Sequence, residues 1–485
     1  MAGTQSHCTV LDHLYSACPS GYQYTEIKVK EGRGKKISMD LAGKRILVIG
    51  LGKTGIAAAR FLVGQGAIVT VTDEKPLAEW EGTLREIGDL HTNLKIGSYD
   101  SDSLSRTDMV IPSPGVLPFN PLLSEAVRRK IPILSEIELA FRFLKRPMIA
   151  ITGTNGKTTT THLMGEILKK SGKKVSVRGN IGDPLIGYVE GKQDEDYVVV
   201  EVSSFQLQWM QYFHPFIAIL LNTTRDHVNY HGTFEAYCRV KERIFENQTV
   251  GDLAILNADD PRSESLSKRI AARIRYFSSS STLQNGIFLH GSSLSYCGDG
   301  KREEYPLAMV KIPGKHNIEN IMATVIAARE CGCSPADIIS AVLDFQGVPH
   351  RIEFAGEKNG VAFYDDSKGT NVGAVMRALE TFPRPIILLM GGRDKEGDFK
   401  TLIPPIKEKV KELLLFGEAR ERINTLIGGV VKTAQFAKLG EAIEMAWQHA
   451  SAGDVVLLSP GCASFDEFSD YRARGRFFKE AVRNI

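Results

Sequence analysis

The sequence predicts an α/β protein with three domains, each built around a mainly parallel sheet. Three observations lead to this prediction. At 485 residues the chain is too long for one ordinary hydrophobic core. A buried strand followed by a glycine turn and a helix occurs twice, at residues 44–63 and 148–170. Beyond residue 360, further apolar runs end in polar loops. We expect domains at residues 41–146, 147–346 and 347–485, after an atypical and poorly ordered extension at residues 1–40.

The composition excludes several classes of protein. Lys and Arg number 60 against 57 Asp and Glu, and no basic block interleaves with aromatic residues, so we expect no nucleic-acid partner. The seven scattered cysteines indicate reduced thiols in a cytoplasmic protein. No apolar run reaches the length of a membrane span, and the first forty residues contain no signal-peptide run, so we expect no membrane insertion.

The first domain begins with the pattern of a nucleotide-binding unit. A strand at Lys44–Gly50 leads into Gly50–Gly55, a literal G-x-G-x-x-G turn, and a helix at Thr54–Val63. The next strand, Ile68–Asp73, ends in an acid, and Met109–Gly115 is a further strand. Taken alone, the pattern suggests NAD. The turn itself requires only a diphosphate near a helix N-terminus, so other nucleotide diphosphates remain open.

The central domain begins with a phosphate-binding loop of unusual length. The strand Met148–Thr152 stops at a turn with Gly153 and Gly156, and Lys157 precedes a helix at Thr158–Lys170. Backbone N–H groups there bind phosphate oxygens, the lysine neutralises charge, and the Thr158 hydroxyl can bind Mg²⁺. The general P-loop pattern has four residues between its glycines, whereas this loop has two. The sequence therefore predicts a shorter variant of the P-loop.

Polar groups follow the next strands of the central domain. Tyr197–Leu207 reads as a buried strand that carries Glu201, and Phe216–Asn222 is the strand before His227. A buried carboxylate requires a cation nearby. With the Thr158 hydroxyl, Glu201 and His227 are candidates for an Mg²⁺ site. By composition alone, Lys241 is an ordinary solvated helix lysine.

A later helix of the central domain is expected at Asn317–Cys331, with Asn317 as its N-cap and Asn320 one turn further on. These amides either contact a nucleotide base or simply cap the helix. The segments Ser278–Thr282 and Gly298–Glu304 read as loops around short β segments.

The third domain follows a plausible hinge at Gly347–Arg351. Its expected strands form a third parallel sheet, namely Val361–Asp366, Pro385–Met390, Glu412–Phe416 and Val455–Leu458. Lys368 and Lys395 follow two of these strands, where ligands bind in such sheets, so they suggest an acidic ligand. Each lysine alone is more often solvated surface.

Several ordered motifs together resemble the Mur ligases. They are Thr152–Thr158, Glu201–Gln206, Asn222–His227, His316–Asn320, His350–Arg351 and Asp366–Asn371. Within that family, Gly391–Lys395 and Leu458–Asp466 resemble the member that adds D-glutamate to UDP-N-acetylmuramoyl-L-alanine. The resemblance extends from about Leu41 to the C-terminus. It implies a Rossmann-like N-terminal domain that binds UDP rather than NAD, a central P-loop ATPase-type domain and a Rossmann-like C-terminal domain.

The resemblance also implies a set of site residues. For ATP these are Gly153, Thr154, Asn155, Gly156, Lys157, Thr158, Thr159, Asn320, Arg351, Asp366 and Lys368. For the UDP substrate they are Lys53, Thr54, Asp73, Glu74, Lys75, Ser113, Gly115 and Asn180. For D-glutamate they are Lys368, Thr370, Lys395, Ser464 and Tyr471. Catalysis would use Lys157, Asn180, Glu201, Ser203, His227 and Lys241.

Two Mg²⁺ ions are implied, with Thr158, Glu201, His227 and a carbamylated Lys241 as ligands. The implied activity is peptide-bond formation through an acyl phosphate in peptidoglycan precursor synthesis, by a cytoplasmic monomer. Three other activities remain open. They are a nicotinamide-dependent oxidoreductase, a P-loop NTPase that acts as a switch, and a folylpolyglutamate synthase.

Overall fold

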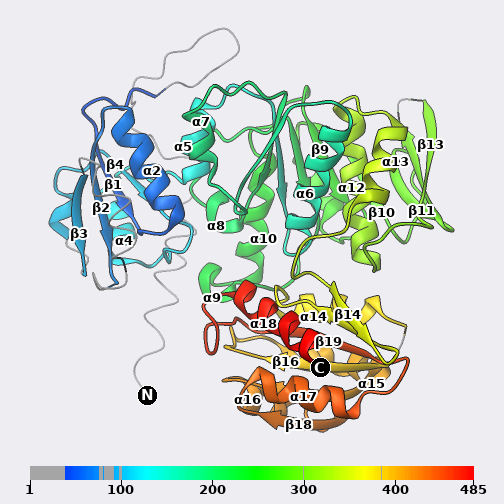
Figure 1. Cartoon of the computed structure of the whole chain (residues 1–485). Helices are drawn as coiled ribbons and strands as arrows, with labels where there is room; N and C mark the ends of the chain where they lie inside the picture. The colour runs from blue at the N-terminus through cyan, green and yellow to red at the C-terminus, as the bar shows by residue number, and fades with distance from the viewer. Residues whose placement is uncertain (1–38, 76–79, 81–91, 98–100, 299, 384) are drawn as a thin grey trace.

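The computed structural model describes residues 39–75, 80, 92–97, 101–298, 300–383 and 385–485, and it contains three sheets (Figure 1). The expected extension therefore lies almost wholly outside the described residues. Met39, which we included in that extension, is buried in the first core.

The first sheet has four parallel strands in the order β3-β2-β1-β4. Their bounds are β1 Arg45–Ile49, β2 Ile68–Asp73, β3 Thr92–Ile96 and β4 Met109–Pro112. The helices of this part are α2 Lys53–Gly64, η2 Ser101–Leu104, α4 Pro121–Arg128 and α5 Glu136–Phe143. As predicted, the glycine turn joins β1 to α2. A Cβ on Gly55 would lie 1.9 Å from the Gly50 carbonyl oxygen, so this turn requires glycine.

The central sheet has nine strands in the order β13-β12-β11-β10-β9-β8-β5-β7-β6. Their bounds are β5 Met148–Thr152, β6 Val175–Gly179, β7 Tyr197–Glu201, β8 Ile217–Leu220, β9 Leu253–Asn257, β10 Arg273–Ser278, β11 Gly286–His290, β12 Ser293–Gly298 and β13 Lys301–Pro306. The pairings from β6 to β11 are parallel, and β12 and β13 add an antiparallel end that the sequence did not indicate.

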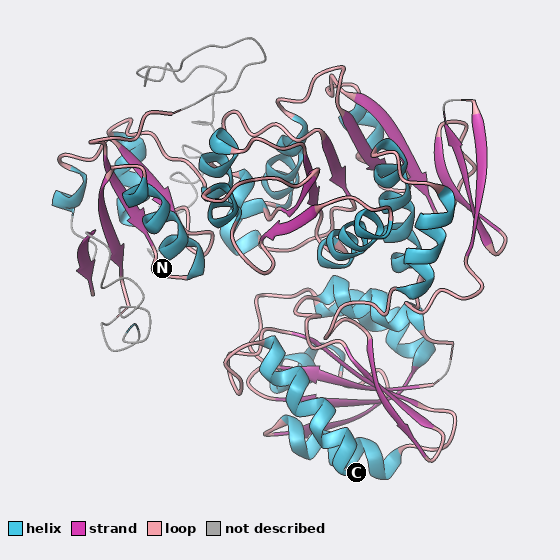
Figure 2. Ribbon diagram, turned by 45° about the horizontal axis from the view of Figure 1, so that its top comes forward, coloured by secondary structure: helices cyan, strands magenta, loops and turns pink. Residues whose placement is uncertain are grey.

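Helices cover both faces of the central sheet (Figure 2). Their bounds are α6 Lys157–Lys170, α7 Leu185–Val189, α8 Ser204–Leu207, α9 Val228–His231, α10 Phe234–Glu242, η3 Arg243–Phe245, α11 Ser263–Ser267, α12 Lys315–Glu330 and α13 Pro335–Asp344. α6, α12 and α13 bury apolar residues against one face. The other face shares its core with α2 and α5 of the first domain, where the Phe61 and Phe143 rings lie 4.9 Å apart.

The third sheet has six strands in the order β14-β15-β19-β16-β17-β18. Their bounds are β14 Glu353–Lys358, β15 Val361–Asp365, β16 Ile386–Gly391, β17 Val410–Phe416, β18 Lys432–Phe436 and β19 Val455–Gly461. The helices are α14 Val372–Thr381, η4 Phe399–Leu402, α15 Ile403–Lys409, α16 Arg420–Ile427, α17 Leu439–His449 and α18 Tyr471–Asn484. Two separate cores lie on the two faces of this sheet.

The structure corrects four predictions about these elements. The strand at Tyr197 ends at Glu201, because Ser203 and Gln206 form a capping box that starts α8. The helix expected to begin at Asn317 begins at Lys315, with Gly314 at the N-cap. Part of Gly298–Glu304 is the strand β13. The third sheet is parallel except for β14, which pairs antiparallel with β15.

Within the described part of the chain, no helix combines the length and the apolar character needed to cross a membrane.

Candidate active site

The phosphate loop lies between β5 and α6 and is fastened to the end of β8. The Thr154 N–H donates to the Asn222 carbonyl oxygen at 2.9 Å, and the Asn155 N–H donates to the Asn222 side chain at 3.0 Å. Gly156 has φ +87°, and a Cβ there would lie 2.2 Å from Asn320 Oδ1. Only glycine fits this position without a change in its surroundings.

The Lys157 ammonium folds back onto the phosphate loop. Its Nζ donates to the carbonyl oxygens of Gly153 at 2.8 Å and Thr154 at 2.7 Å. Burial lowers the pKa of Lys157. The cation thus lies at the helix start, as the sequence predicts.

Glu201 places a buried carboxylate beside this loop. Asn180 Nδ2 donates to Oε1 at 2.8 Å, whereas Oε2 is buried and has no hydrogen-bond partner among the described residues. Burial by itself raises the pKa of Glu201, but Lys368, Lys157 and the Asn180 hydrogen bond outweigh it, so the pKa is lowered. The free carboxylate oxygen and the Thr158 hydroxyl are the oxygen donors that Mg²⁺ prefers.

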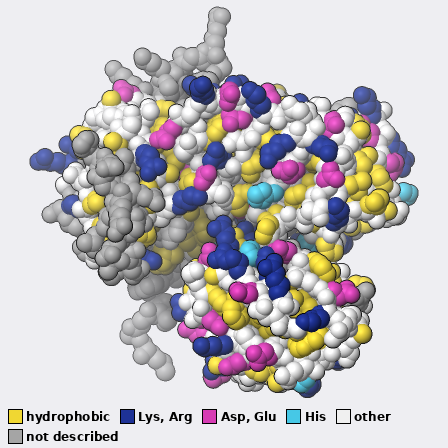
Figure 3. Space-filling view, viewed as in Figure 1, with side chains coloured by type: hydrophobic (Ala, Val, Ile, Leu, Met, Phe, Trp, Pro, Cys, Tyr) yellow, Lys and Arg dark blue, Asp and Glu magenta, His cyan; other side chains and the backbone are white. Residues whose placement is uncertain are grey.

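Two cations of the third domain reach the same threonine. Arg351 Nη2 and Lys368 Nζ each donate to Thr158 Oγ1 at 3.1 Å. Burial and the charge of Arg351 lower the pKa of Lys368 to about 7. Lys and Arg side chains also gather on the surface where the third domain approaches the rest of the molecule (Figure 3). This concentration of positive charge suits a polyphosphate.

His227 is held in an unusual backbone conformation at the start of α9. Its φ is +51°, its N–H donates to Asp226 Oδ1 at 2.9 Å, and its ring lies 4.8 Å from that of Phe205. Burial lowers the pKa of His227 to about 4. The imidazole is therefore neutral at pH 7, which is the form that binds a metal.

Lys241 is only 1% exposed, contrary to an ordinary helix lysine. Its Nζ donates to the Gly153 carbonyl oxygen at 2.9 Å and lies 4.8 Å from the Tyr237 ring centre. Burial lowers the pKa of Lys241 well below its usual value. The shift favours a neutral, nucleophilic amine.

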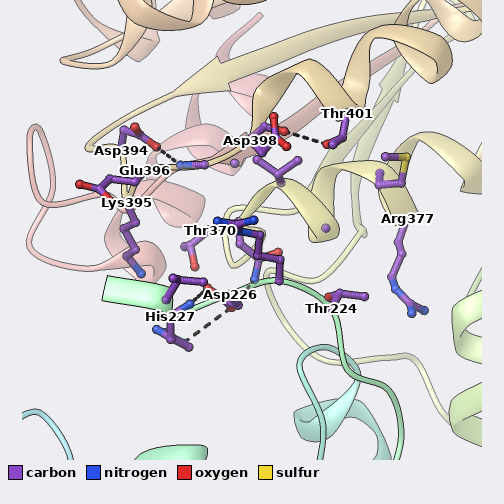
Figure 4. A pocket seen from close by; sticks show the side chains of 18 of the residues that line it. Thr224, Asp226, His227, Thr370, Arg377, Asp394, Lys395, Glu396, Asp398 and Thr401 are labelled. Atoms are coloured by element: carbon purple, nitrogen blue, oxygen red, sulfur yellow. Dashed lines mark hydrogen bonds and ion pairs between the residues drawn. The ribbon is translucent and has the colours of Figure 1, made fainter. Parts of the chain in front are cut away.

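A cavity of about 450 Å³ lies between the central and third domains (Figure 4). Thr224, Asp226 and His227 line its central-domain side, and Thr370 and Lys395 line the other. Figure 4 shows the Lys395 side chain pointing toward His227. A carboxylate bound by this lysine would thus lie within the same cavity as the histidine.

Three Mur ligase family models match successive parts of this chain. Residues 44–135 match the model described as Mur ligase MurD-like, N-terminal domain. Residues 151–328 match the Mur ligase middle domain, and residues 350–462 match the Mur ligase, glutamate ligase domain. A protein of Syntrophus aciditrophicus named UDP-N-acetylmuramoylalanine--D-glutamate ligase is 59% identical, covering 92% of this chain and 99% of that protein. One of the same name from Geotalea daltonii is 46% identical with the same coverage.

The chain belongs to the Mur ligase family.

Solved Mur ligases share its fold at low sequence identity. The MurF ligase from Thermotoga maritima, solved in complex with ADP, has a TM-score of 0.58 at 16% identity and covers 95% of this chain and 98% of its own. The UDP-N-acetylmuramate-alanine ligase MurC of the same organism has a TM-score of 0.57 at 20% identity and covers 91% of this chain and 99% of its own. The predicted α/β fold with three domains is confirmed.

In this Mur ligase most residues predicted for the UDP substrate lie at the carboxyl ends of β1, β2 and β4 of the first sheet, whereas Asn180 follows β6 of the central sheet. Ser113 Oγ donates to the Gly50 carbonyl oxygen at 3.1 Å, next to Thr54 at the glycine turn and the exposed Gly115. Lys53 Nζ pairs with Asp183 Oδ1 at 2.8 Å, on the loop that carries Asn180.

Asp73 uses both carboxylate oxygens within the chain. They accept the N–H groups of Leu51 at 2.8 Å and Lys75 at 2.9 Å. Glu74 and Lys75 are exposed, and Lys75 Nζ lies 5.5 Å from the Trp80 ring centre. The roles of these three residues toward a substrate stay predictions.

The remaining predicted ATP residues surround the phosphate loop. Thr154 Oγ1 lies 3.0 Å from the Tyr237 hydroxyl, and Thr159 is buried in the first turn of α6. Asn320 contacts Gly156, while its Nδ2 donates to Asn317 Oδ1 at 3.2 Å. Asn317 in turn donates to the Pro313 carbonyl oxygen at 2.7 Å, which is a structural role at the helix start.

Asp366, also predicted for ATP, directly follows β15 and is buried. Its Oδ2 accepts the Ser459 hydroxyl at 2.7 Å, and burial raises its pKa to about 7.

Of the residues predicted for D-glutamate or catalysis, Thr370, Lys395 and His227 line the cavity. The others do not, namely Lys157, Asn180, Glu201, Ser203, Lys241, Lys368, Ser464 and Tyr471. Ser464 is 2% exposed after β19, and Tyr471 begins α18 with its ring centre 5.0 Å from Lys368 Nζ. Ser203 caps α8.

Sequence reasoning missed Asn371 and Arg377, which approach the central domain. Asn371 Nδ2 donates to Asp226 Oδ2 at 2.8 Å, and Arg377 Nη1 lies 3.4 Å from Glu319 Oε2. Both line the cavity together with Gly373 and Glu380. Arg377 and Glu380 are three residues apart and therefore share one face of α14, which the sequence could have indicated. Asn371 is the N-cap of this helix and gave no such signal.

Proposed function

We propose that this Mur ligase uses ATP to join D-glutamate to UDP-N-acetylmuramoyl-L-alanine in peptidoglycan precursor synthesis. The observation that carries the proposal is the meeting of Arg351 and Lys368 with Thr158, beside a cavity that contains His227 and Lys395. The names of the relatives at 59% and 46% identity support the choice of substrates.

The donor groups of the phosphate site fit ATP with Mg²⁺. The phosphate loop leads into the N-terminus of α6, where backbone N–H groups bind phosphate oxygens. The buried Glu201 Oε2, which has no hydrogen-bond partner among the described residues, calls for a cation. Thr158 and Glu201 would hold one ion, and His227 and a carbamylated Lys241 would hold a second. When bound, the ions supply charge neutralisation at the phosphate oxygens.

The chain itself supplies three further positive charges around the triphosphate. Lys157 exchanges its bonds to the loop carbonyls for phosphate oxygens, while Arg351 and Lys368 approach from the third domain. Charge in the transition state of phosphoryl transfer spreads over the γ-phosphoryl oxygens, so positioned cations provide much of the catalysis.

The reaction consists of two transfers. The terminal carboxylate of the acceptor attacks the γ-phosphorus, so a carboxyl-oxygen–phosphorus bond forms as the bond to ADP breaks. The D-glutamate amine then attacks the acyl carbon, and the tetrahedral intermediate expels phosphate as the amine loses its proton. Lys395 would bind a carboxylate of D-glutamate through its ammonium and hold the amine near the acyl carbon.

Carbamylation of Lys241 is supported by its surroundings. A neutral lysine amine is required to add CO₂, and burial shifts Lys241 toward that form. The product is an oxygen ligand in place of a cation, beside the Gly153 carbonyl and the phosphate loop.

We further propose that the enzyme is a cytoplasmic monomer with functional domains at residues 41–146, 147–346 and 347–485. Lys53, Thr54, Asp73, Glu74, Lys75, Ser113, Gly115 and Asn180 would bind the UDP substrate. Thr370, Ser464 and Tyr471 would complete the D-glutamate site.

The test measures phosphate release from ATP and Mg²⁺ with UDP-N-acetylmuramoyl-L-alanine and a panel of D- and L-amino acids. We expect phosphate release only when D-glutamate is the added amino acid. Release that ignores the amino acid would contradict the proposal and favour an NTPase switch, and release with a folate acceptor and L-glutamate would favour a folylpolyglutamate synthase.

A further inference from the structure

The segment that joins the central and third domains contains two residues in a conformation that is rare for their types. His350 has φ +68° and Ile352 has φ +47°, and they flank Arg351, whose guanidinium lies on Thr158. Left-handed backbone is unfavourable for a histidine and more so for a β-branched isoleucine. Such strain persists only where the surroundings fix the conformation, and it is often found at functional sites.

A buried hydrogen bond holds this turn. His350 Nδ1 lies 2.7 Å from Asp365 Oδ2, and the two residues are 7% and 0% exposed. Asp365 ends β15, so the bond ties the turn to the rigid third sheet. A Cβ on Gly475 of α18 would lie 2.1 Å from His350 Nδ1, so that helix approaches the pair as closely as glycine allows.

The same pair also reaches the loop that carries Lys368. The His350 carbonyl oxygen accepts the Lys368 N–H at 3.1 Å, and Asp365 Oδ1 accepts the Ser367 N–H at 2.8 Å. His350 and Asp365 therefore support both third-domain cations that meet Thr158.

His350, Asp365 and Glu353 also place ligand atoms within 4.8 Å of one another, as a metal site would. Their donors are already committed. Glu353 accepts Lys479 Nζ at 2.9 Å through both oxygens and the His350 N–H at 2.8 Å. This arrangement favours a structural network over an ion.

We propose that His350 and Asp365 are a positioning pair that sets the affinity for ATP by holding Arg351 and Lys368 toward Thr158. The inference rests on the proposed function only in taking the phosphate loop as the ATP site. It adds that nucleotide affinity depends on a turn whose histidine side chain is hydrogen-bonded to Asp365.

Three substitutions of His350 separate the backbone from the hydrogen bond. His350→Gly allows the left-handed backbone but has no side-chain donor. His350→Ala strains the backbone and also lacks the donor. His350→Asn tolerates the backbone and presents an amide N–H at the position of Nδ1. Asp365→Asn is a fourth variant that tests the partner.

The control is His449→Asn. His449 Nδ1 lies 2.9 Å from Oε2 of the buried Glu412, so the two form a similar pair in the same domain. Glu412 is on β17, which is three strands from β15. Any loss caused only by weakening the third domain will appear in this variant too.

The experiment measures the Kd for ADP by calorimetry, and the KM for ATP and kcat by phosphate release. We expect about a tenfold or larger rise in the Kd for ADP and the KM for ATP for His350→Gly, His350→Ala and Asp365→Asn. A fall in kcat should accompany it, because Arg351 and Lys368 also neutralise charge in the transition state. His350→Asn should stay within about threefold of the unmodified protein.

Three results would overturn the proposal: unchanged nucleotide affinity in the glycine, alanine and Asp365 variants, an equal loss in His449→Asn, or an equal loss in His350→Asn. Because ADP binding needs neither acceptor nor amino acid, its result is distinguishable from a failure of the proposed ligase reaction.

Discussion

Lys241 is the residue whose surroundings differ most from what its chemistry requires. An ammonium is among the most costly groups to bury, yet this side chain is almost fully enclosed and contacts a carbonyl oxygen and an aromatic ring. A carbamate would turn the same position into an anion beside Lys157. The residue therefore makes a sharp test of the second metal ligand.

Lys241→Ala should lose most ligase activity, by about 100-fold or more, because the site loses a metal ligand. Added acetate or formate should restore part of the activity by supplying a carboxylate oxygen in the space that the side chain leaves. The measurement is D-glutamate-dependent phosphate release with and without the added acid. Full activity of Lys241→Ala without added acid would contradict the carbamate hypothesis.

The buried Glu136 carboxyl makes the folding stability depend on pH. Its Oε1 accepts the Ile186 N–H at 2.7 Å, its Oε2 is buried without a partner in the described part of the chain, and burial raises its pKa to about 7. Between pH 4.5 and 7 the folded protein thus binds this proton more tightly than the unfolded chain does. The stability it contributes is complete at low pH and is lost as the pH rises toward 7.

Glu136→Gln should remove this pH dependence. In the unmodified protein we expect the free energy of unfolding to fall by about 3 kcal/mol from this group between pH 4.5 and 7.5. Thermal unfolding at several pH values gives the slope of the free energy of unfolding against pH for each protein. Glu264→Gln, at a side chain that is 86% exposed, is the matched control and should keep the original slope. Identical slopes in all three proteins would contradict the prediction.

At the scale of elements, the phosphate loop is the unit that the sequence describes best. Gly, Lys and Thr at the junction of β5 and α6 predicted both the turn and the helix start, because the requirements are local. The phosphate loop is closely packed at Gly156. The Gly156 backbone is left-handed, and Asn320 occupies the space that a side chain at this position would need.

Gly156→Ala should therefore weaken ATP binding by about tenfold to 100-fold, from backbone strain and displacement of Asn320. The size of the thermal shift produced by ATP measures this. Gly187→Ala in α7 is the control, because no atom lies within 4 Å of the added Cβ and its φ is ordinary. An ATP response in Gly156→Ala equal to that of the control would refute the prediction.

Three different physical causes explain the elements that the sequence missed or misjudged. β14 and β18 are polar strands at the two edges of the third sheet, so they lack the apolar runs that identify a buried strand. β12 and β13 form an antiparallel end whose pairing depends on distant residues. The early end of β7 was missed because a local capping box outweighed the apolar character of residues 205–207.

At the scale of the whole molecule, the site depends on the third domain lying against the central one. The sequence placed Thr158 and Lys368 after strands and Arg351 in a hinge. Their meeting at 3.1 Å is a result of domain packing, which no local pattern encodes. Asn371 and Arg377 were missed for the same reason. Their partners, Asp226 and Glu319, lie on another domain.

Asn371 should help to hold the third domain against the central domain through its hydrogen bond to Asp226. It also caps α14 by accepting the Ala374 N–H at 2.8 Å, so a useful variant must keep the cap. Asn371→Asp keeps an acceptor at the cap and places a second carboxylate against Asp226. We expect a larger radius of gyration without ligand and a KM for D-glutamate raised by about tenfold.

Small-angle scattering with and without ATP and acceptor measures the radius of gyration. Asn371→Ser is the control, because serine keeps the cap without adding charge. A radius of gyration for Asn371→Asp that equals that of the unmodified protein would show that the contact with Asp226 does not hold the two domains together.

The core shared by the first and central domains bears on how the chain is made. Apolar residues of α2 and α5 pack in one cluster with β5, β7, β8 and β9, whereas the third domain buries both faces of its sheet by itself. During synthesis from the N-terminus, the first sheet therefore emerges with an incomplete core and must wait for more than a hundred further residues. The last domain to leave the ribosome is the one equipped to fold alone.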